Sequence, residues 1–418
     1  MMKMNICRHL AAVGIAAISL SLAACDNEDE GRNPSLDTPT QISLPEGTRA
    51  VTESGNDFSF RLFREYSEWR PGNVAISPLN VMTNLAMLAN GDNAEGRDEI
   101  FKALGIDPSQ TDIETLNAYC QALLSQLPEA DSNTDIRFAN SLWNAPGKAE
   151  INPAFASTLS GMFDAEMIKK SPSGIEGMTA VNKWCSENTK GCIDRLLTEP
   201  LDERITTALL NAVYFKGSWK DKFDTAQTKA GIFHNADGSE SEVEYMHQKH
   251  LYSYSPLDEV RAIRLPYGNG NFDMTIIMPE GDNNIGRLAA TIDRDFMIRL
   301  NREAKSTEVD FQMPKFECET NEDLQELLAD KFGVKRLFDE GLNSIYATGN
   351  FPASMFRHAV NIRVDEDGSE AAASTIVPGT YISPSYDTGV MKVDRPFIFI
   401  ISESTTGAII FIGQITDL

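Results

Sequence analysis

Two histidines, His247 and His250, have the spacing closest to that of a metal site in this 418-residue chain. Imidazole nitrogens bind zinc-like ions when they converge on one side of an element. Here the alternation around the pair predicts a strand, on which residues three apart point to opposite faces. The sequence also contains no CxxC pair and no HExxH motif. It therefore predicts no metal site.

Motifs for catalysis and for cofactor binding are likewise absent from the sequence. There is no G-x-S-x-G nucleophile elbow and no glycine-rich loop of the kind that holds phosphates. A hydrolase needs a nucleophile and a base that converge, and no such pattern is visible. We therefore expect a protein that is not an enzyme and that uses no cofactor.

The segment Val364–Val377 has an unusual composition, because small residues follow a strand-like run without a turn or helix cap. If it is extended, alternate residues point to alternate faces. One face then carries five small or uncharged residues: Ser369, Ala371, Ala373, Thr375 and Val377. The other face carries Glu370, Ala372, Ser374 and Ile376. The first face could enter a sheet without burying a charge, a burial that costs several kcal/mol.

The overall composition, with 42% apolar and 23% charged residues, is that of a folded globular protein. Acidic residues outnumber basic ones by 61 to 37, which gives a formal net charge of -24. A charge of that sign repels phosphate backbones, so nucleic-acid binding is not expected.

The N-terminus has the features of a bacterial lipoprotein signal peptide over residues 1–24. Lys3 and Arg8 precede a short apolar run, and Leu22–Cys25 resembles a lipobox, in which Cys25 is acylated after cleavage. An ordinary secretory signal with a chance cysteine is the alternative. Acidic residues at 26–30 resemble the surface-export signal of lipoproteins in Bacteroides-like bacteria. We expect a lipid-anchored protein of the outer membrane or cell surface of such a Gram-negative bacterium, or one anchored facing the periplasm.

Residues 25–50 are predicted to be the lipidated cysteine and a flexible acidic tether. Residues 26–50 contain three prolines and six acids but no aromatic residue, a composition that cannot bury a core. The folded domain is therefore expected to span residues 51–418.

Four cysteines remain once the signal peptide and Cys25 are set aside, too few for a disulfide scaffold. Cys185 and Cys192 are close enough in sequence for a local disulfide in an oxidising compartment. A bridged pair and two free thiols are both open alternatives.

Helical and strand periodicities alternate irregularly, without a βαβ rhythm or a repeat, which favours one large α+β domain. A helix is predicted around Phe58–Tyr66, and a second is predicted after Ser77, which can cap it, and Pro78. Strands are predicted at Ala208–Phe215, Met274–Met278, Asn361–Val364, Phe397–Ile401 and Ala408–Ile412.

Several motifs resemble those of the serpins, in the order and spacing of that family. They are the runs Asn73–Asn80, Asn211–Trp219, Asp394–Ile401 and Phe411–Gly413, and the resemblance spans about Asp57–Leu418. It implies a monomeric α+β domain with a large central β-sheet, further β-sheets, surrounding helices and an exposed reactive-centre loop at about residues 366–392.

The resemblance also implies a function, the inhibition of serine and also cysteine proteases. In the family, the protease attacks the exposed loop and forms an acyl-enzyme, and the cut loop then inserts into the central sheet and distorts the protease. Insertion of this kind releases strain. The small residues after Ser369 suit it, because bulky or charged residues there are typical of relatives that do not inhibit. A non-inhibitory binding or structural lipoprotein is the alternative.

Counting from Glu366 as the family does places the reactive bond at Ile382–Ser383, with Tyr381 or Tyr386 as alternatives if the register differs. Ile382 suits elastase-like proteases, and a tyrosine would suit chymotrypsin-like or subtilisin-like enzymes. Trypsin-like targets are disfavoured, since the loop carries no basic residue before Lys392. Pro378 lacks a backbone donor and would cost about 1 kcal/mol if it entered the sheet.

The resemblance further assigns residues that control insertion. The hinge comprises Glu366, Gly368, Ser369, Glu370, Ala371, Ala372 and Ala373. Polar residues under the sheet are Ser77, Asn211 and His358. At the top of the sheet, Glu366 should form an ion pair with Lys315, close to Trp219. Residues 112–128 contain no Lys or Arg, so no heparin-type cofactor is expected there.

Overall fold

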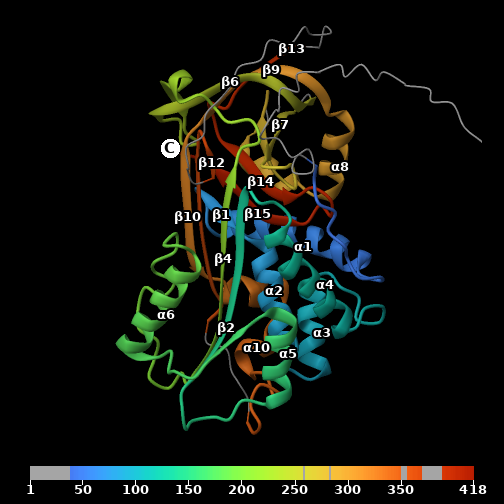
Figure 1. Cartoon of the computed structure of the whole chain (residues 1–418), viewed down its shortest axis with the longest axis vertical. Coiled ribbons are helices and arrows are strands. Elements are labelled where there is room, and N and C mark those ends of the chain that lie inside the picture. The colour runs from blue at the N-terminus through green and yellow to red at the C-terminus, as the bar shows by residue number, and fades with distance from the viewer. Residues whose placement is uncertain (1–37, 258, 282–283, 350–354, 370–387) are drawn as a thin grey trace, which may run out of the picture.

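The computed structural model describes residues 38–257, 259–281, 284–349, 355–369 and 388–418. The molecule is elongated, and two β-sheets form its centre with helices packed around them (Figure 1). The predicted α+β architecture with a large sheet and surrounding helices is confirmed.

One sheet has six strands in the order β10-β11-β12-β4-β2-β3 and forms the long axis of the molecule. Its strands are β10 (Phe316–Asp323), β11 (Arg357–Asp365), β12 (Gly368–Ser369), β4 (Thr207–Ser218), β2 (Thr134–Asn144) and β3 (Glu166–Ile168). β12 is antiparallel to both of its neighbours, so β11 and β4 run parallel to each other.

The second sheet follows the order β1-β15-β14-β8-β7-β6-β9-β13, and β5 pairs with β6 outside this path. Its strands are β1 (Val74–Ile76), β15 (Ile409–Ile415), β14 (Phe397–Glu403), β8 (Phe272–Pro279), β7 (Val260–Tyr267), β6 (Glu240–Leu257), β9 (Lys305–Pro314), β13 (Thr388–Lys392) and β5 (Lys229–His234). Every residue of β8 and β15 is buried, including the polar residues Asp273, Thr275 and Gln414.

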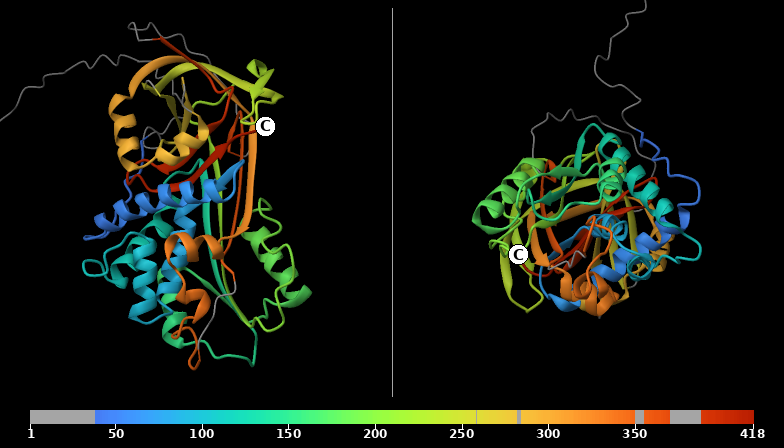
Figure 2. Two further views of the ribbon diagram at one scale, coloured as in Figure 1. Left: turned by 180° about the vertical axis from the view of Figure 1, so that it is seen from behind. Right: turned by 90° about the horizontal axis from the view of Figure 1, so that it is seen from below.

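The helices are α1 (Arg49–Trp69), α2 (Pro78–Ala89), α3 (Ala94–Ala103), α4 (Ile113–Gln126), α5 (Pro153–Phe163), α6 (Gly174–Asn188), α7 (Ile285–Thr291), α8 (Arg294–Glu303), α9 (Gln325–Phe332) and α10 (Arg336–Asp339). Figure 2 shows α6 on one face of the six-stranded sheet and the group around α1 and α2 on the other. Within the described residues, no helix has the length and apolarity that a membrane span requires.

The predicted helices and strands are all present. The side chain of Ser77 caps α2 through the amide of Asn80, and Pro78 occupies the first turn, as the sequence indicates. All twelve residues of α2 are buried, so this helix supports the sheet from within the core. The two strands predicted at the C-terminus pair with each other as β14 and β15.

The predicted start of the folded domain at Val51 is too late. Ile42 is 3% exposed, and its amide donates to the hydroxyl of Thr405. The amide of Thr40 donates to Asn271 at 2.6 Å. One apolar side chain in this polar stretch is buried in the core, and contacts with the folded body begin by Thr40. Residues 1–37, including Cys25, lie outside the described residues.

No disulfide joins Cys185 and Cys192 in the structure, so the alternative of a local disulfide is not realised there. Cys185 is buried on α6, and burial raises the pKa of its thiol to about 12. His247 and His250 lie on β6, as predicted, and each pairs with a different carboxylate, Asp310 and Asp221 respectively.

Candidate functional site: a strand slot between β11 and β4

The two-residue strand β12 occupies the space between the upper ends of β11 and β4 (Figure 1). Ser369 pairs with Val364 of β11 and with Gly217 of β4. Both pairings are antiparallel, so β12 has the direction of a strand that could continue down the sheet between its neighbours. Among the described residues, no direct ladder joins β11 to β4 below this point.

Gly368 is required by the backbone geometry at the entrance of the slot. Its φ of +141° is rarely adopted by residues with a side chain. A Cβ atom there would lie 1.9 Å from the carbonyl oxygen of Gly217, which is much closer than any normal contact. The chain can therefore turn into the slot only at a glycine.

Ser369 points into the core and is 2% exposed. Its hydroxyl lies 2.9 Å from the hydroxyl of Tyr267 on β7. The Tyr267 ring is fully buried and stacks on Trp219 with 4.4 Å between the ring centroids. The side of the segment that carries Ser369 is thus the core-facing side.

Backbone contacts hold the residues just before β12. The indole nitrogen of Trp219 donates to the carbonyl of Asp365, and its backbone amide donates to Asp367, both at 2.9 Å. Lys222 forms an ion pair with Asp367 at 3.0 Å. Trp219, which the resemblance places close to Glu366, therefore binds both neighbours of that residue directly.

The ion pair expected between Glu366 and Lys315 is present, with 3.6 Å between Oε1 and Nζ. Lys315 also pairs with Glu244 at 2.5 Å, and the Glu244 carboxylate is the main reason why the pKa of Lys315 is raised. The hydroxyl of Thr228 donates to Glu366 at 2.6 Å. The Glu366 carboxylate is thus held by two side chains, of which the resemblance indicated only Lys315.

Under the sheet, His358 of β11 contacts the start of α2. The backbone amide of Ser77 donates to Nε2 of His358 at 3.1 Å, and this contact places the histidine proton on Nδ1. His358 is 1% exposed, and burial lowers its pKa to about 4, so the ring is neutral at physiological pH. Its Nδ1 has no hydrogen-bond partner among the described residues.

Asn211 of β4 reaches α2 through two asparagines that sequence reasoning missed. Its Nδ2 donates to the carbonyl of Asn80 at 3.3 Å, and its Oδ1 accepts from Asn84 at 3.2 Å. Asn80 and Asn84 lie four residues apart on a helix that is otherwise mostly apolar, and this spacing was the available signal. Ser77, Asn211 and His358 are thus all brought to the junction of α2 with the sheet.

A cavity of about 410 Å³ lies below these contacts, at the lower ends of the two strands. Thr207 to Leu210 at the start of β4 line one side, and Phe356 and Arg357 at the start of β11 line another. The slot is therefore filled by β12 at its top and hollow at its bottom.

The remaining hinge residues and the predicted reactive bond fall in residues 370–387, outside the described residues. They are Glu370, Ala371, Ala372, Ala373, Tyr381, Ile382, Ser383 and Tyr386. The described chain resumes at β13, which pairs in parallel with β9 through Thr388 and Glu308.

Comparison with known proteins agrees with this geometry. The family model described as serpin (serine protease inhibitor) matches residues 53–418. The leukocyte elastase inhibitor of Sus scrofa is 28% identical over 383 residues, which cover 88% of this chain and 99% of that protein.

Two solved structures are also similar. The native state of the thermophilic serpin tengpin has a TM-score of 0.79 and 28% identity, covering 91% of this chain and 96% of tengpin. A thyroxine-binding globulin in complex with thyroxine has a TM-score of 0.79, covering 88% of this chain and 98% of its own, but at 22% identity it shows the fold alone. With the family model matched over most of its length, the chain belongs to the serpin family.

Proposed function

We propose that the protein is a suicide inhibitor of serine proteases, and of cysteine proteases of similar specificity, that traps its target by inserting the cleaved loop between β11 and β4. The observation that carries this proposal is β12 itself. The first two residues of the inserting strand already pair with both neighbours, in the direction that insertion needs.

Extension of β12 in its present register would bring a residue with a hydroxyl group opposite two polar residues of the neighbouring strands. Thr375 is six residues beyond Ser369, so it would lie opposite His358 on β11 and Asn211 on β4. Its side chain would point to the core, as that of Ser369 does. A threonine hydroxyl can both donate and accept, and it would arrive where Nδ1 of His358 has no partner.

The charge pattern of the segment fits the same register. Ser369 faces the core, so Ala371, Ala373, Thr375 and Val377 would face it too, while Glu370 would face away. No charged side chain would be buried against the core. This supports the inhibitory function over a non-inhibitory binding or structural role.

Pro378 costs no more in this register than the sequence suggests. β11 begins at Arg357, whose partner would be Ile376, so Pro378 lies beyond the end of β11. It would adjoin only Ala208 of β4, near the hollow end of the slot. At most one ladder hydrogen bond is lost, worth about 1 kcal/mol.

The covalent step is ordinary acyl transfer. The serine oxygen of the protease attacks the carbonyl carbon of Ile382, the bond to Ser383 breaks, and the amine of Ser383 takes a proton. An ester to Ile382 remains, and insertion would stop water from hydrolysing it. Elastase-like proteases are the expected targets, with chymotrypsin-like and subtilisin-like enzymes next, and each inhibitor molecule acts once as a monomer.

The test is to mix the purified chain with pancreatic elastase, chymotrypsin and subtilisin and to analyse the products on denaturing gels. A boiling-resistant band at the summed mass establishes trapping, and the mass of the released C-terminal peptide identifies the cleaved bond. Cleavage of the loop by every protease without an adduct, and with an unchanged melting temperature, would contradict insertion and favour the non-inhibitory alternative.

Two variants give a matched control for the insertion step. In the proposed register Ala373 faces the core between Val360 and Val213, whereas Ala372 faces outward. Ala373→Glu should turn the inhibitor into a substrate, because a buried carboxylate blocks insertion. Ala372→Glu should still form the adduct. Equal adduct formation by the two variants would show that the register is wrong.

We also propose that Cys25 carries a lipid that anchors the protein to the outer membrane or cell surface of a Gram-negative, Bacteroides-like bacterium. The support is the sequence of residues 1–30 alone. Labelled palmitate should be incorporated by the full chain and not by the Cys25→Ser variant, which should appear in the soluble fraction. Protease treatment of whole cells then distinguishes an outward-facing anchor from one that faces the periplasm.

A further inference from the structure

The five residues that follow β4, residues 219–223, bind the whole stretch 365–367 that leads into β12. The amide of Phe223 donates to the carbonyl of Glu366 at 3.1 Å, in addition to the contacts described above for Trp219 with the residues on either side of it. We call residues 219–223 the hinge clamp. Because each residue of the stretch is bound, a looser clamp would leave β12 less firmly held.

Two side chains of β6 attach the hinge clamp to the sheet that contains this strand. The side-chain amide of Gln248 donates to the carbonyl of Lys222 at 3.0 Å. Nε2 of His250 lies 3.3 Å from Oδ2 of Asp221 and pairs with it. A glutamine has no charge to gain or lose, so of these two attachments only the histidine pair responds to pH.

A cavity of about 150 Å³ adjoins this pair, and residues of the hinge clamp, β6, β7 and β8 line it. Its charged lining residues are Asp221, His250, Arg264 and Asp273. Nη2 of Arg264 donates to Asn301 of α8 at 2.6 Å, which fixes the guanidinium. The side chain of His250 is 40% exposed, so it exchanges protons with solvent. The histidine pair thus lies next to a second carboxyl group and a fixed cation.

The other charged groups near the histidine pair come from β9 and from the hinge clamp itself. Those of β9 are paired with neighbouring side chains of β6, namely Asp310 with His247 and Glu308 with Lys249. The cations of the hinge clamp are Lys220 and Lys222, and Lys222 pairs with Asp367. Asp273 is thus the carboxyl group that shares the cavity with the histidine pair.

The charge of the cavity lining reverses as the pH rises. In weak acid His250 is charged, and its hydrogen bond with Asp221 is the main reason why its pKa is raised. Burial raises the pKa of Asp273 to about 6, so this carboxyl is largely neutral below that pH. Above these pKa values His250 loses its charge while Asp273 gains one, and the Asp221 carboxylate then faces a like charge across the cavity. The clamp loses an attraction and meets a repulsion.

We propose that His250 and Asp221 make the hinge clamp sensitive to pH, so that it holds the entry of β12 more tightly in weak acid than above neutral pH. Such a clamp acts on the uncut chain, whether or not the protein captures a protease. The pair is partly exposed, so the expected effect is modest, about a threefold change in the opening equilibrium of the hinge.

The test is amide hydrogen exchange of residues 364–369 at about pH 5.5 and about pH 8, corrected for the intrinsic pH dependence of exchange and read by mass spectrometry. Protection of these amides in the parent chain should be about threefold lower at the higher pH. In His250→Gln the glutamine can still donate to Asp221 but carries no charge, so most of the difference should disappear. Asp221→Asn removes both the attraction and the repulsion, so the difference should vanish.

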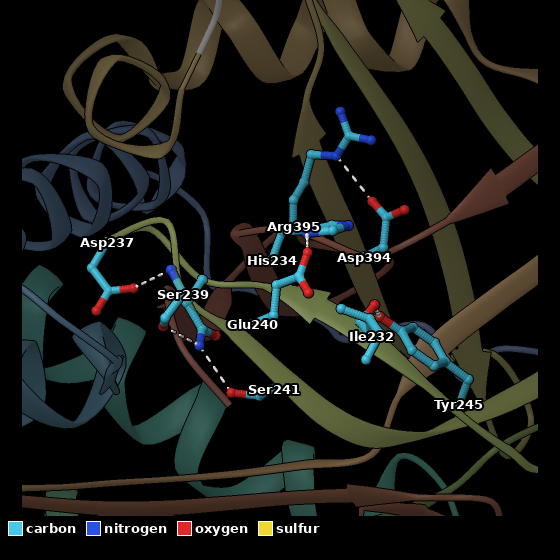
Figure 3. Close-up of polar contacts among 10 residues, drawn as sticks. Ile232, His234, Asp237, Ser239, Glu240, Ser241, Tyr245, Asp394 and Arg395 are labelled. Carbon is cyan, nitrogen blue, oxygen red and sulfur yellow. Dashed lines mark hydrogen bonds and ion pairs between the residues drawn. The ribbon is translucent and has the colours of Figure 1, made fainter.

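A matched control is available in the hairpin of β5 and β6. Figure 3 shows its own histidine pair, His234 and Glu240, with 3.2 Å between Nδ1 and Oε1. In the described part of the chain, no hydrogen bond or ion pair joins these two residues to the hinge clamp. His234→Gln should therefore keep the pH dependence of the parent chain.

Equal protection at both pH values in the parent chain would overturn the inference. A difference that persists in both His250→Gln and Asp221→Asn would also overturn it, and would point to Asp365, whose pKa is raised by burial within the hinge itself. Loss of the difference in His234→Gln would show that the effect is not specific to the clamp. Because no protease is used, these outcomes are independent of the inhibition assay, and the melting temperature reports whether each variant is folded.

Discussion

The hydroxyl of Tyr267 lies 2.9 Å from the hydroxyl of Ser369, and this contact holds the first inserted side chain of the loop against the core. Because Tyr267 also stacks on Trp219, the same ring joins β12 to the residue that binds the backbone at Asp365 and Asp367. The upper end of the slot is thus one packed unit.

Loss of the Tyr267 hydroxyl should loosen β12. In Tyr267→Phe, one buried hydrogen bond worth about 1 kcal/mol is removed while the ring stack remains. We expect faster amide hydrogen exchange at Gly368 and Ser369. Tyr252→Phe is the control, since the Tyr252 hydroxyl is also hydrogen-bonded but to Gln248 and not to β12. Unchanged exchange at Ser369 in Tyr267→Phe would show that the contact does not hold the strand.

Removal of Glu366 should destabilise the native monomer. Glu366→Ala breaks the contacts to Lys315 and Thr228, so insertion or polymerisation without a protease should become faster. A loss of about 1 kcal/mol corresponds to about a fivefold shorter monomer half-life, measured by size-exclusion chromatography. In Glu244→Ala, Lys315 keeps Glu366, so the effect should be smaller. An unchanged half-life of Glu366→Ala would argue against this role.

His358 should make the protein less stable in acid. Its pKa is about 4 in the folded protein against an ordinary value of 6.5, because burial disfavours the charged ring. The folded state therefore resists protonation, and stability should be lost as the pH falls from about 6.5 to 4, by about 3 kcal/mol in total.

The measurement for His358 is the urea midpoint as a function of pH, for the parent chain and for His358→Gln. Glutamine can still accept from Ser77, so the variant should fold and should lose this pH dependence. His250→Gln should change the profile in the opposite sense, since Asp221 raises the pKa of His250 and stabilises its charged form. Identical profiles of the parent chain and His358→Gln between pH 6.5 and 4 would contradict the prediction for His358.

The carboxyl of Asp273 should change the stability in the direction opposite to His358, over nearly the same pH range. Burial raises the pKa of its carboxyl to about 6, although the charge of Arg264 partly offsets this. A raised carboxyl pKa costs stability above pH 6, and that cost disappears as the pH falls towards 4. Asp273→Asn should therefore raise the urea midpoint at pH 8 and leave it nearly unchanged at pH 4. A lower midpoint at pH 8 would show that the carboxylate has a stabilising partner.

Local patterns in the sequence were sufficient for much of the fold. The start of α2 at Ser77–Pro78 and the apolar run of β8 follow from capping and burial, which act within a few residues. The burial of Ile42 could not be predicted from the sequence, because a single apolar residue in a polar stretch shows no periodicity. Contacts between distant segments, such as Glu244 with Lys315, leave no trace in local sequence.

The residues of the candidate site could be predicted where the family resemblance named them. The contacts that they make with other side chains of this chain could not be predicted. Ser77, Asn211 and His358 meet α2 as the resemblance implies. The asparagines Asn80 and Asn84 were missed, because polar residues in a helix are usually read as its solvent-exposed face. The pairing of Gly368 and Ser369 with two strands at once was also not visible, since two residues are too few to show alternation.

The two pairs that β12 already makes bear on how fast the proposed insertion of the loop would be. Starting a new strand fixes several backbone angles before any ladder forms, whereas adding to an existing one gains hydrogen bonds with each residue fixed. On the proposed function, insertion after cleavage is then elongation of β12 and not nucleation of a new strand. On the same proposal, the fraction of encounters that end in capture would be set by the rate of this elongation relative to the rate at which each protease releases its acyl group.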